Sequence, residues 1–252
     1  MSIYYGVITF IFGLVLGSFY TVVGERMPEG KSIITPASHC PNCGHVLKFY
    51  ELIPVLSFIF LKGKCSKCKS KIPILSTLIE ILTGALFLIS FLVFGISIKF
   101  FISLIFVSML MIVIVSDIRY MLIDDEILII ASILIFILSI FEYGIKQSLF
   151  FVLYGIVCFV VMFLIKIMGD FIFKKESMGG GDIKLMFVFG LTMGIPSSIA
   201  SIFLASFIGL PISLIMLKKN SSHELPFGPY LSVAAIILFL SQIDIVNILV
   251  NI

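Results

Sequence analysis

Two aspartates stand at the edges of apolar segments in a chain that carries few charged residues. Asp182 follows three glycines directly before an apolar segment, and Asp117 lies just after the apolar run 98–115. A carboxylate at such a place is costly and is by default a functional residue. Two carboxylates that share a proton can hydrolyse a peptide bond, because the ionised one activates water while the protonated one polarises the carbonyl group. Asp117 and Asp182 are therefore the predicted catalytic pair.

The residues beside Asp182 are candidates for positioning a substrate. Gly179, Gly180 and Gly181 lack Cβ atoms, so an extended peptide could lie close to their backbone. Lys184 could bind a substrate carboxylate or tune the acid pair. The structural alternative is a flexible loop, with Asp182 capping a helix and Lys184 reaching to the membrane interface.

Composition identifies an integral membrane protein. Of 252 residues, 60% are hydrophobic and 12% are charged, whereas about a quarter of the residues in soluble domains are charged. We expect an all-α polytopic membrane protein with about eight transmembrane helices and a small zinc-ribbon-like insertion. The predicted segments are 3–24, 74–94, 98–115, 127–141, 148–168, 183–194, 197–217 and 230–250. The fourth and sixth are shorter than the usual ~20 residues, so they either extend into flanking residues or are shielded from lipid by neighbours.

Basic residues predict the orientation, because loops rich in Lys and Arg stay in the cytoplasm. With eight alternating segments, all of the 17 basic residues except Lys99 and Lys146 fall on one side. That side also carries Asp117, Asp182 and the polar insertion, so these are expected in the cytoplasm and both termini outside it. The first segment lacks a charged start and a cleavage pattern, which favours a membrane span over a removable signal peptide. The excess of positive charge thus reflects the orientation in the membrane. We expect the lipid bilayer as a partner and no binding to nucleic acid.

The polar insertion 25–73 contains two Cys-x-x-Cys pairs, and 21 residues lie between the end of the first pair and the start of the second. The four cysteines are Cys40, Cys43, Cys65 and Cys68. This spacing predicts a zinc ribbon in which four thiolates enclose a structural Zn²⁺ and fold a loop too small for its own core. Two disulfides are the alternative, but they need an oxidising compartment. Gly44 and Gly63 suit turns beside the two pairs, whereas His39 and His45 are expected to be solvated. The expected domains are the first transmembrane helix 1–24, the cysteine domain 25–73 and a membrane peptidase domain 74–252.

These residues together resemble one family, the bacterial type IV prepilin peptidases, which are bifunctional leader peptidases and N-methyltransferases of the GxGD class of membrane aspartyl proteases. The resemblance runs through nearly the whole chain. It covers Gly17-Ser18-Phe19, Arg26-Met27-Pro28, the stretches 38–43, 50–57 and 62–68 of the cysteine domain, Asp117 with 122–125, Gly179 to Leu185, and Pro226-Phe227-Gly228-Pro229. Glu80 stands where the family usually carries a glutamate in the second span.

The resemblance implies cleavage of the basic leader of type IV prepilins or pseudopilins at the cytoplasmic side of the bacterial inner membrane. It also implies N-methylation of the new N-terminal residue from S-adenosylmethionine. The cofactor site is not assigned by the sequence, and Glu80 is a weak candidate by resemblance. The chain departs from the family's pattern at two places. Asp124 stands where a proline is common, and residues 74–77 lack the basic and tyrosine-proline residues often found there. The second departure could weaken methyl transfer.

Three alternatives remain open at the level of sequence. The chain could be a peptidase that has lost methyl transfer, a transporter whose intramembrane acids carry protons or cations, or a membrane scaffold without catalysis. A transporter predicts repeated halves, and the sequence shows no internal repeat. The sequence reveals neither the oligomeric state nor which pilin is cleaved.

Overall fold

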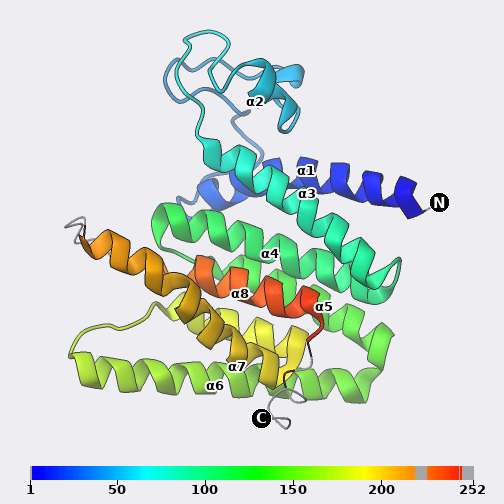
Figure 1. Ribbon diagram of the computed structural model, residues 1–252, viewed down its shortest axis with the longest axis vertical. Helices are drawn as coiled ribbons and strands as arrows, with labels where there is room; N and C mark the ends of the chain where they lie inside the picture. The colour runs from blue at the N-terminus through cyan, green and yellow to red at the C-terminus, as the bar shows by residue number, and fades with distance from the viewer. Residues whose placement is uncertain (1, 219–225, 244, 246–252) are drawn as a thin grey trace. The chain divides into compact units, whose positions relative to one another are not determined.

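The computed structural model describes residues 2–218, 226–243 and 245, and its elements in that part of the chain are helices (Figure 1). The long ones are α1 (Ser2–Arg26), α3 (Ile74–Phe94), α4 (Ile98–Tyr120), α5 (Asp125–Tyr143), α6 (Ile145–Phe173), α7 (Gly180–Lys218) and α8 (Gly228–Ser241). Two short helices, η1 (Phe49–Glu51) and α2 (Leu56–Phe60), lie in the cysteine insertion. Among the described helices, α1 and α3 to α7 are long and apolar enough to cross a membrane. The predicted all-α membrane fold is confirmed.

Two of the eight predicted segments, 183–194 and 197–217, correspond to the two helical arms of α7. Gly194 interrupts this helix with φ 74° and ψ 176°, a conformation open mainly to glycine. In Figure 1 the two arms of α7 run in opposite directions across the view. The short fourth segment gains flanking residues and becomes the 19-residue α5. The eighth segment is shorter than predicted, since α8 ends at Ser241, and its expected end at 250 lies outside the described residues.

The chain divides into two compact units, Met1–Gly95 and Ile96–Ile252. In the first unit, α1 packs against α3 at glycines one helical turn apart. A Cβ atom added at Gly13 would lie 2.8 Å from the Cα of Gly84, and one added at Gly17 would lie 2.8 Å from the Cα of Glu80. Small residues permit such close contact between membrane helices, where lipid offers no hydrophobic drive for association.

The second unit contains α4 to α8, and aromatic and small residues form its core. The ring of Phe106 on α4 lies 5.7 Å from that of Phe189 on α7 and 5.2 Å from that of Phe239 on α8. Gly155 and Gly190 bring α6 and α7 together, since an added Cβ at Gly190 would lie 2.7 Å from the Cα of Gly155. This packing holds α8 against α4 and α7, the two helices that carry the predicted catalytic residues.

Candidate active site and metal centre

Asp117 lies in the last turn of α4, where the helix leaves its apolar segment. The helix ends at Met121, which adopts the left-handed conformation with φ 52° and donates its amide to the Asp117 carbonyl. The side chain of Asp117 is turned inward, and the residue is only 6% exposed. Its Oδ2 has no hydrogen-bond partner within the described part of the chain. The backbone amide of Gly228 bonds this carboxylate. A buried carboxylate oxygen without a partner is still unusual and points to function.

Asp182 lies in the first turn of α7 and is 7% exposed. Its Oδ1 also lacks a hydrogen-bond partner among the described residues. A helix N-terminus favours a carboxylate, so the position of Asp182 also agrees with the structural alternative, in which it only caps the helix. It does not explain why the oxygen is buried and unpaired.

The structure brings the two aspartates together, although 64 positions separate them in the chain. Ile123, in the turn after α4, links them by contact. A Cβ atom added at Gly181 would lie 2.7 Å from Ile123 Cβ, and one added at Gly228 would lie 3.2 Å from Ile123 Cδ1 and 2.6 Å from Asp117 Oδ2. The two carboxylates are close enough for the charge on Asp117 to act on Asp182.

The glycines before Asp182 have different surroundings. Gly181 is pressed against Ile123, so its missing Cβ serves the packing of α7. At Gly180 no atom lies within 4 Å of an added Cβ, and at Gly179 the nearest is Asp182 Oδ2 at 3.8 Å. Only Gly179 and Gly180 thus leave open space beside the acid pair.

Lys184 is half-exposed and forms an ion pair that joins α7 to the start of α5. Its Nζ lies 2.7 Å from each carboxylate oxygen of Asp125. This pairing gives Lys184 a structural partner, and its predicted role toward substrate stays a prediction.

Two further residues border the acid pair, Gly228 and Ile123, and neither was among the predicted site residues. Gly228 is the first residue of α8 and is buried against Asp117. The run Pro226-Phe227-Gly228-Pro229 carries part of the family resemblance, but nothing in the sequence shows which acid it contacts. Ile123 reads as one apolar residue among many, because its role depends on three segments meeting.

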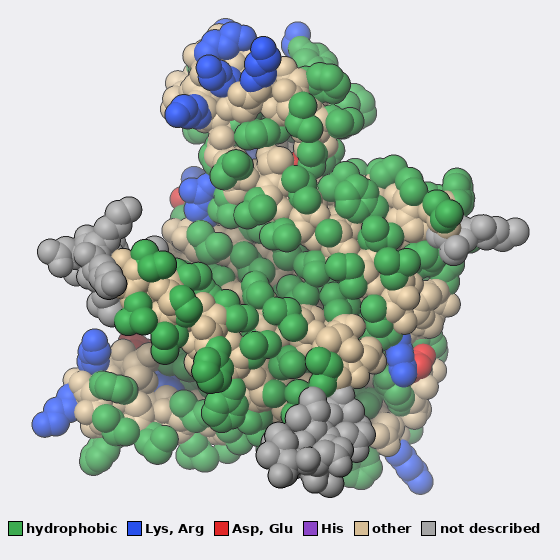
Figure 2. Space-filling model, in the orientation of Figure 1, with side chains coloured by type: hydrophobic (Ala, Val, Ile, Leu, Met, Phe, Trp, Pro, Cys, Tyr) green, Lys and Arg blue, Asp and Glu red, His purple; other side chains and the backbone are tan. Residues whose placement is uncertain are grey.

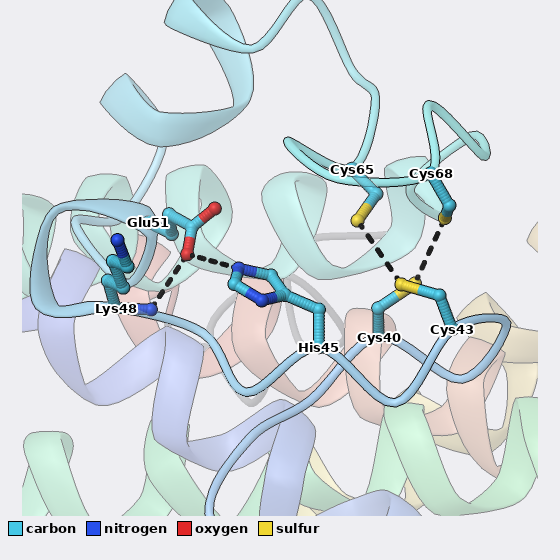
Figure 3. A network of polar contacts seen from close by, with 7 residues as sticks. All are labelled: Cys40, Cys43, His45, Lys48, Glu51, Cys65 and Cys68. Carbon is cyan, nitrogen blue, oxygen red and sulfur yellow. Dashed lines mark hydrogen bonds and ion pairs between the residues drawn. The ribbon is translucent and has the colours of Figure 1, made fainter.

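The four predicted cysteines converge in the first unit, from two loops that face each other (Figure 3). Their Sγ atoms all lie within 4.8 Å of one another, with 3.7 Å between Cys40 and Cys68 and 4.0 Å between Cys43 and Cys65. Zn–S distances of about 2.3 Å in a tetrahedron give S–S edges of about 3.8 Å. The donor set therefore fits Zn²⁺, and these separations exceed the ~2.05 Å of a disulfide bond.

Each cysteine pair sits in a loop of the same construction. The Cys40 amide donates to the His45 carbonyl and the Gly44 amide to the Cys40 carbonyl, and Cys65 repeats this pattern with Ser70 and Lys69. The left-handed position is Gly44 in the first loop and Lys69 in the second. Gly63 also lies in a turn with positive φ, as expected beside the second pair: it closes the turn after α2 by donating its amide to the Phe58 carbonyl.

The hydroxyl of Ser70 supports the thiolate form of two ligands. Its Oγ lies 3.0 Å from Cys68 Sγ and 3.6 Å from Cys40 Sγ. This contact lowers the pKa of Cys68 and lowers the pKa of Cys40 to about 6. Metal ligation requires the thiolate, so the surroundings favour binding.

Glu51 joins the cysteine loops through a buried network (Figure 3). Its Oε2 accepts the Lys48 amide at 2.8 Å and lies 3.1 Å from His45 Nε2. The Lys48 amide, together with Ser66 and His45, lowers the pKa of Glu51 to about 2. His45 is thus a half-buried partner of Glu51 rather than a solvated loop residue.

Glu51→Gln should accelerate zinc release from the purified protein about tenfold, as is typical when a polar group supporting a metal site is lost. A low pKa of Glu51 means that its carboxylate stabilises the fold above the ordinary value near 4.3, and that this contribution is lost as the pH falls toward 2. The contribution of the Glu51 carboxylate is therefore fully present at pH 7. Chelator competition at this pH measures how much faster zinc leaves Glu51→Gln than the unmodified protein. Equal release rates at pH 7 would contradict a supporting role for Glu51.

Glu80, the weak cofactor candidate, holds the cysteine insertion against α3. Its Oε2 accepts the Val55 amide at 2.8 Å, and Ser18 of α1 also bonds its carboxylate. The residue is buried, at 7% exposure. This arrangement is a structural tether and does not by itself fit a cofactor site.

Comparison with known proteins agrees with this architecture. Residues 11–94 match the bacterial peptidase A24 N-terminal domain, and residues 104–214 match the type IV leader peptidase family. The chain is 36% identical to a prepilin leader peptidase/N-methyltransferase of Bacillus subtilis over 95% of this chain and 96% of that protein. Proteins of the same name from Pseudomonas aeruginosa and Neisseria gonorrhoeae are each 30% identical over 90% and 91% of this chain, and 87% and 88% of their own lengths. No solved structure matches the chain. With matches that cover both units, the chain belongs to the type IV leader peptidase family.

Proposed function

We infer that this chain removes the leader peptide of type IV prepilins or related pseudopilins and methylates the new N-terminal residue. The observation that carries the peptidase part is the pair of buried aspartates at the end of α4 and the start of α7, each with one carboxylate oxygen that has no hydrogen-bond partner among the described residues. Family membership supports both activities, since the relatives are named for both.

In the proposed mechanism, Asp117 and Asp182 share one proton. The ionised carboxylate takes a proton from a water molecule while that water attacks the scissile carbonyl group. The protonated one polarises that carbonyl and then donates its proton to the leaving amine. Because such a pair titrates as a unit, the two roles belong to the pair rather than to either residue. An extended substrate strand would lie beside Gly179 and Gly180, where the backbone has open space.

We place the acid pair and the cysteine insertion on the cytoplasmic side of the inner membrane, with both termini outside. The distribution of basic residues supports this orientation, because the insertion alone carries five lysines between residues 62 and 71. Leader peptides with basic residues would then meet the site on the side where they are synthesised.

The four cysteines would hold a structural Zn²⁺. A complete set of four thiolates leaves no open position for water, so the metal would stabilise the insertion rather than react. Replacing Cys65 by serine should reduce bound zinc from about one ion per chain to almost none and leave some leader cleavage. Elemental analysis of purified protein measures this.

Cys158→Ser is the matched control for the zinc prediction. Cys158 is buried in α6, far in sequence from the cluster, and does not belong to the four-sulfur set. Its variant should retain zinc. Full zinc content in Cys65→Ser would exclude the proposed site.

Methyl transfer would use S-adenosylmethionine, which supplies the methyl group when bound. The geometry of Glu80 does not fit a cofactor site, so no residue is assigned to S-adenosylmethionine and no step is derived through it. Methylation therefore rests on family membership.

The test is incubation of the purified protein with a type IV prepilin and labelled S-adenosylmethionine, followed by mass analysis of the product. Loss of the leader together with one added, labelled methyl group on the new N-terminus is expected. Leader loss without the methyl group would remove the methyltransferase assignment. An intact prepilin, cleaved by a relative under the same conditions, would remove the peptidase assignment.

A further inference from the structure

The two short helices of the cysteine insertion carry an exposed apolar surface. Phe49 and Phe60 are 86% and 80% exposed, and Tyr50, Leu56 and Ile59 are also exposed. These five residues, which we term the apolar face, belong to η1 and α2, and the two helices contact each other. Contiguous exposed apolar groups of this kind mark a surface that binds a partner or a membrane.

The apolar face is held beside the first turns of α3, a helix of membrane-spanning length. The insertion is connected at both ends to helices of membrane-spanning length, since α1 ends at Arg26 and α3 begins at Ile74. Glu80 lies six residues into α3, about 9 Å along its axis. Its carboxylate binds the amide of Val55, the residue directly before α2. The start of α2 is therefore fixed beside the first turns of α3 rather than beyond its end.

This attachment maintains a strained turn. Val55 has φ 62° and ψ −49°, and the Leu56 amide donates to the Pro54 carbonyl at 2.6 Å, which together form a γ-turn of the rare, strained kind. A β-branched residue takes positive φ only when its surroundings impose it. Glu80 is the group that binds its amide, so α2 is set in place by α3.

Five lysines accompany the apolar face in the same insertion. Figure 2 shows Lys and Arg side chains gathered on the insertion next to hydrophobic ones. The lysines between residues 62 and 71 are Lys62, Lys64, Lys67, Lys69 and Lys71. Aromatic and aliphatic side chains flanked by lysines are typical of segments that lie in the interface of an anionic membrane.

We propose that the apolar face of η1 and α2 docks into the surface of the surrounding bilayer, while the neighbouring lysines contact anionic lipid headgroups. Ile74, the first residue of α3, is also exposed, so the membrane-spanning helix that holds α2 presents apolar side chains from its start. Lipid is thus the apolar phase nearest to α2. The docking is independent of peptide hydrolysis, and its failure would leave the proposed activity unaffected.

A tryptophan probe tests this docking, since the chain contains no tryptophan. Phe60→Trp places a single fluorophore on the apolar face, and Leu92→Trp places one on α3 at a residue that is 70% exposed. Both full-length variants, checked for unchanged zinc content, are placed in nanodiscs of phosphatidylglycerol and brominated phosphatidylcholine. We expect brominated lipid to quench both emissions, and aqueous iodide to quench neither.

Strong iodide quenching of Phe60→Trp without quenching by brominated lipid would overturn the proposal. Protection from iodide that requires an added prepilin would also overturn it, because the face would then bind protein. Discs without phosphatidylglycerol should weaken bromolipid quenching of Phe60→Trp by a factor of about two or more, since the lysines lose their attraction to anionic headgroups. Equal quenching in both discs would exclude the role given to the lysines.

Discussion

Asp117→Asn and Asp182→Asn should each abolish leader cleavage, by a factor of about 10³ or more. Asparagine has nearly the same shape as aspartate but can neither take up nor donate the shared proton, so the pair loses its chemistry. The fold should survive, and its thermal stability should stay equal or rise, because removing one of two neighbouring buried carboxylates relieves the repulsion between them. Cleavage of a prepilin by the purified variants and their thermal unfolding in detergent measure the two effects.

The double variant Asp117→Asn/Asp182→Asn makes this test sharper. Residues that act as one catalytic unit show non-additive effects, so the double variant should be no slower than either single one. Glu126→Gln is the control, since Glu126 is exposed at the start of α5 and should be dispensable. Substantial cleavage by either single variant would show that the two acids are not the catalytic pair.

The sequence singled out the candidate site residues, because each carries a strong local signal. Acids at the ends of apolar segments and paired cysteines stand out against their neighbours, and the structure brings together both Asp117 with Asp182 and the four cysteines. The family prediction is confirmed by the matches over residues 11–94 and 104–214.

The supporting contacts could not be predicted, because they join segments that are distant in the chain. The bond from Glu80 to Val55 crosses from α3 to the insertion, and it places Glu80 as a tether. Similarly, the left-handed turn of the second cysteine loop falls on Lys69, although glycine is the residue that such a conformation favours. Backbone geometry of this kind follows from the arrangement of the loops around the cysteines rather than from local sequence preference.

Helix counting from hydropathy placed the break inside α7 correctly. The predicted segments 183–194 and 197–217 correspond to its two helical arms, and the non-helical residue between them is Gly194, the last residue of the first segment. Hydropathy does not report how two apolar stretches are connected, and here the connection is one sharply bent residue rather than a loop.

Gly228→Ala should reduce leader cleavage by a factor of about 100 while leaving the protein folded. The added methyl group would fall 2.6 Å from Asp117 Oδ2 and 3.2 Å from Ile123 Cδ1, so the carboxylate must move away from Asp182. A displacement of about 1 Å is enough for a loss of this size. The backbone tolerates alanine, because Gly228 begins α8 without positive φ, and alanine favours helix over glycine by ~1 kcal/mol. Cleavage kinetics and thermal unfolding of the purified variant separate loss of activity from loss of fold.

Gly209→Ala provides the matched comparison, with the same added methyl group at a site where α7 faces α8. There the nearest atom to an added Cβ is Cδ2 of the Tyr230 ring at 3.3 Å, and a ring can shift by a few tenths of an ångström without moving a carboxylate. Its cleavage rate should stay close to that of the unmodified protein. If Gly228→Ala were as active as Gly209→Ala, the position of Asp117 against α8 would be irrelevant to catalysis. If both variants lost activity and melted early, the cause would be helix packing. Loss in Gly228→Ala alone, at unchanged stability, would mean that the start of α8 sets the distance across which the two aspartates share their proton.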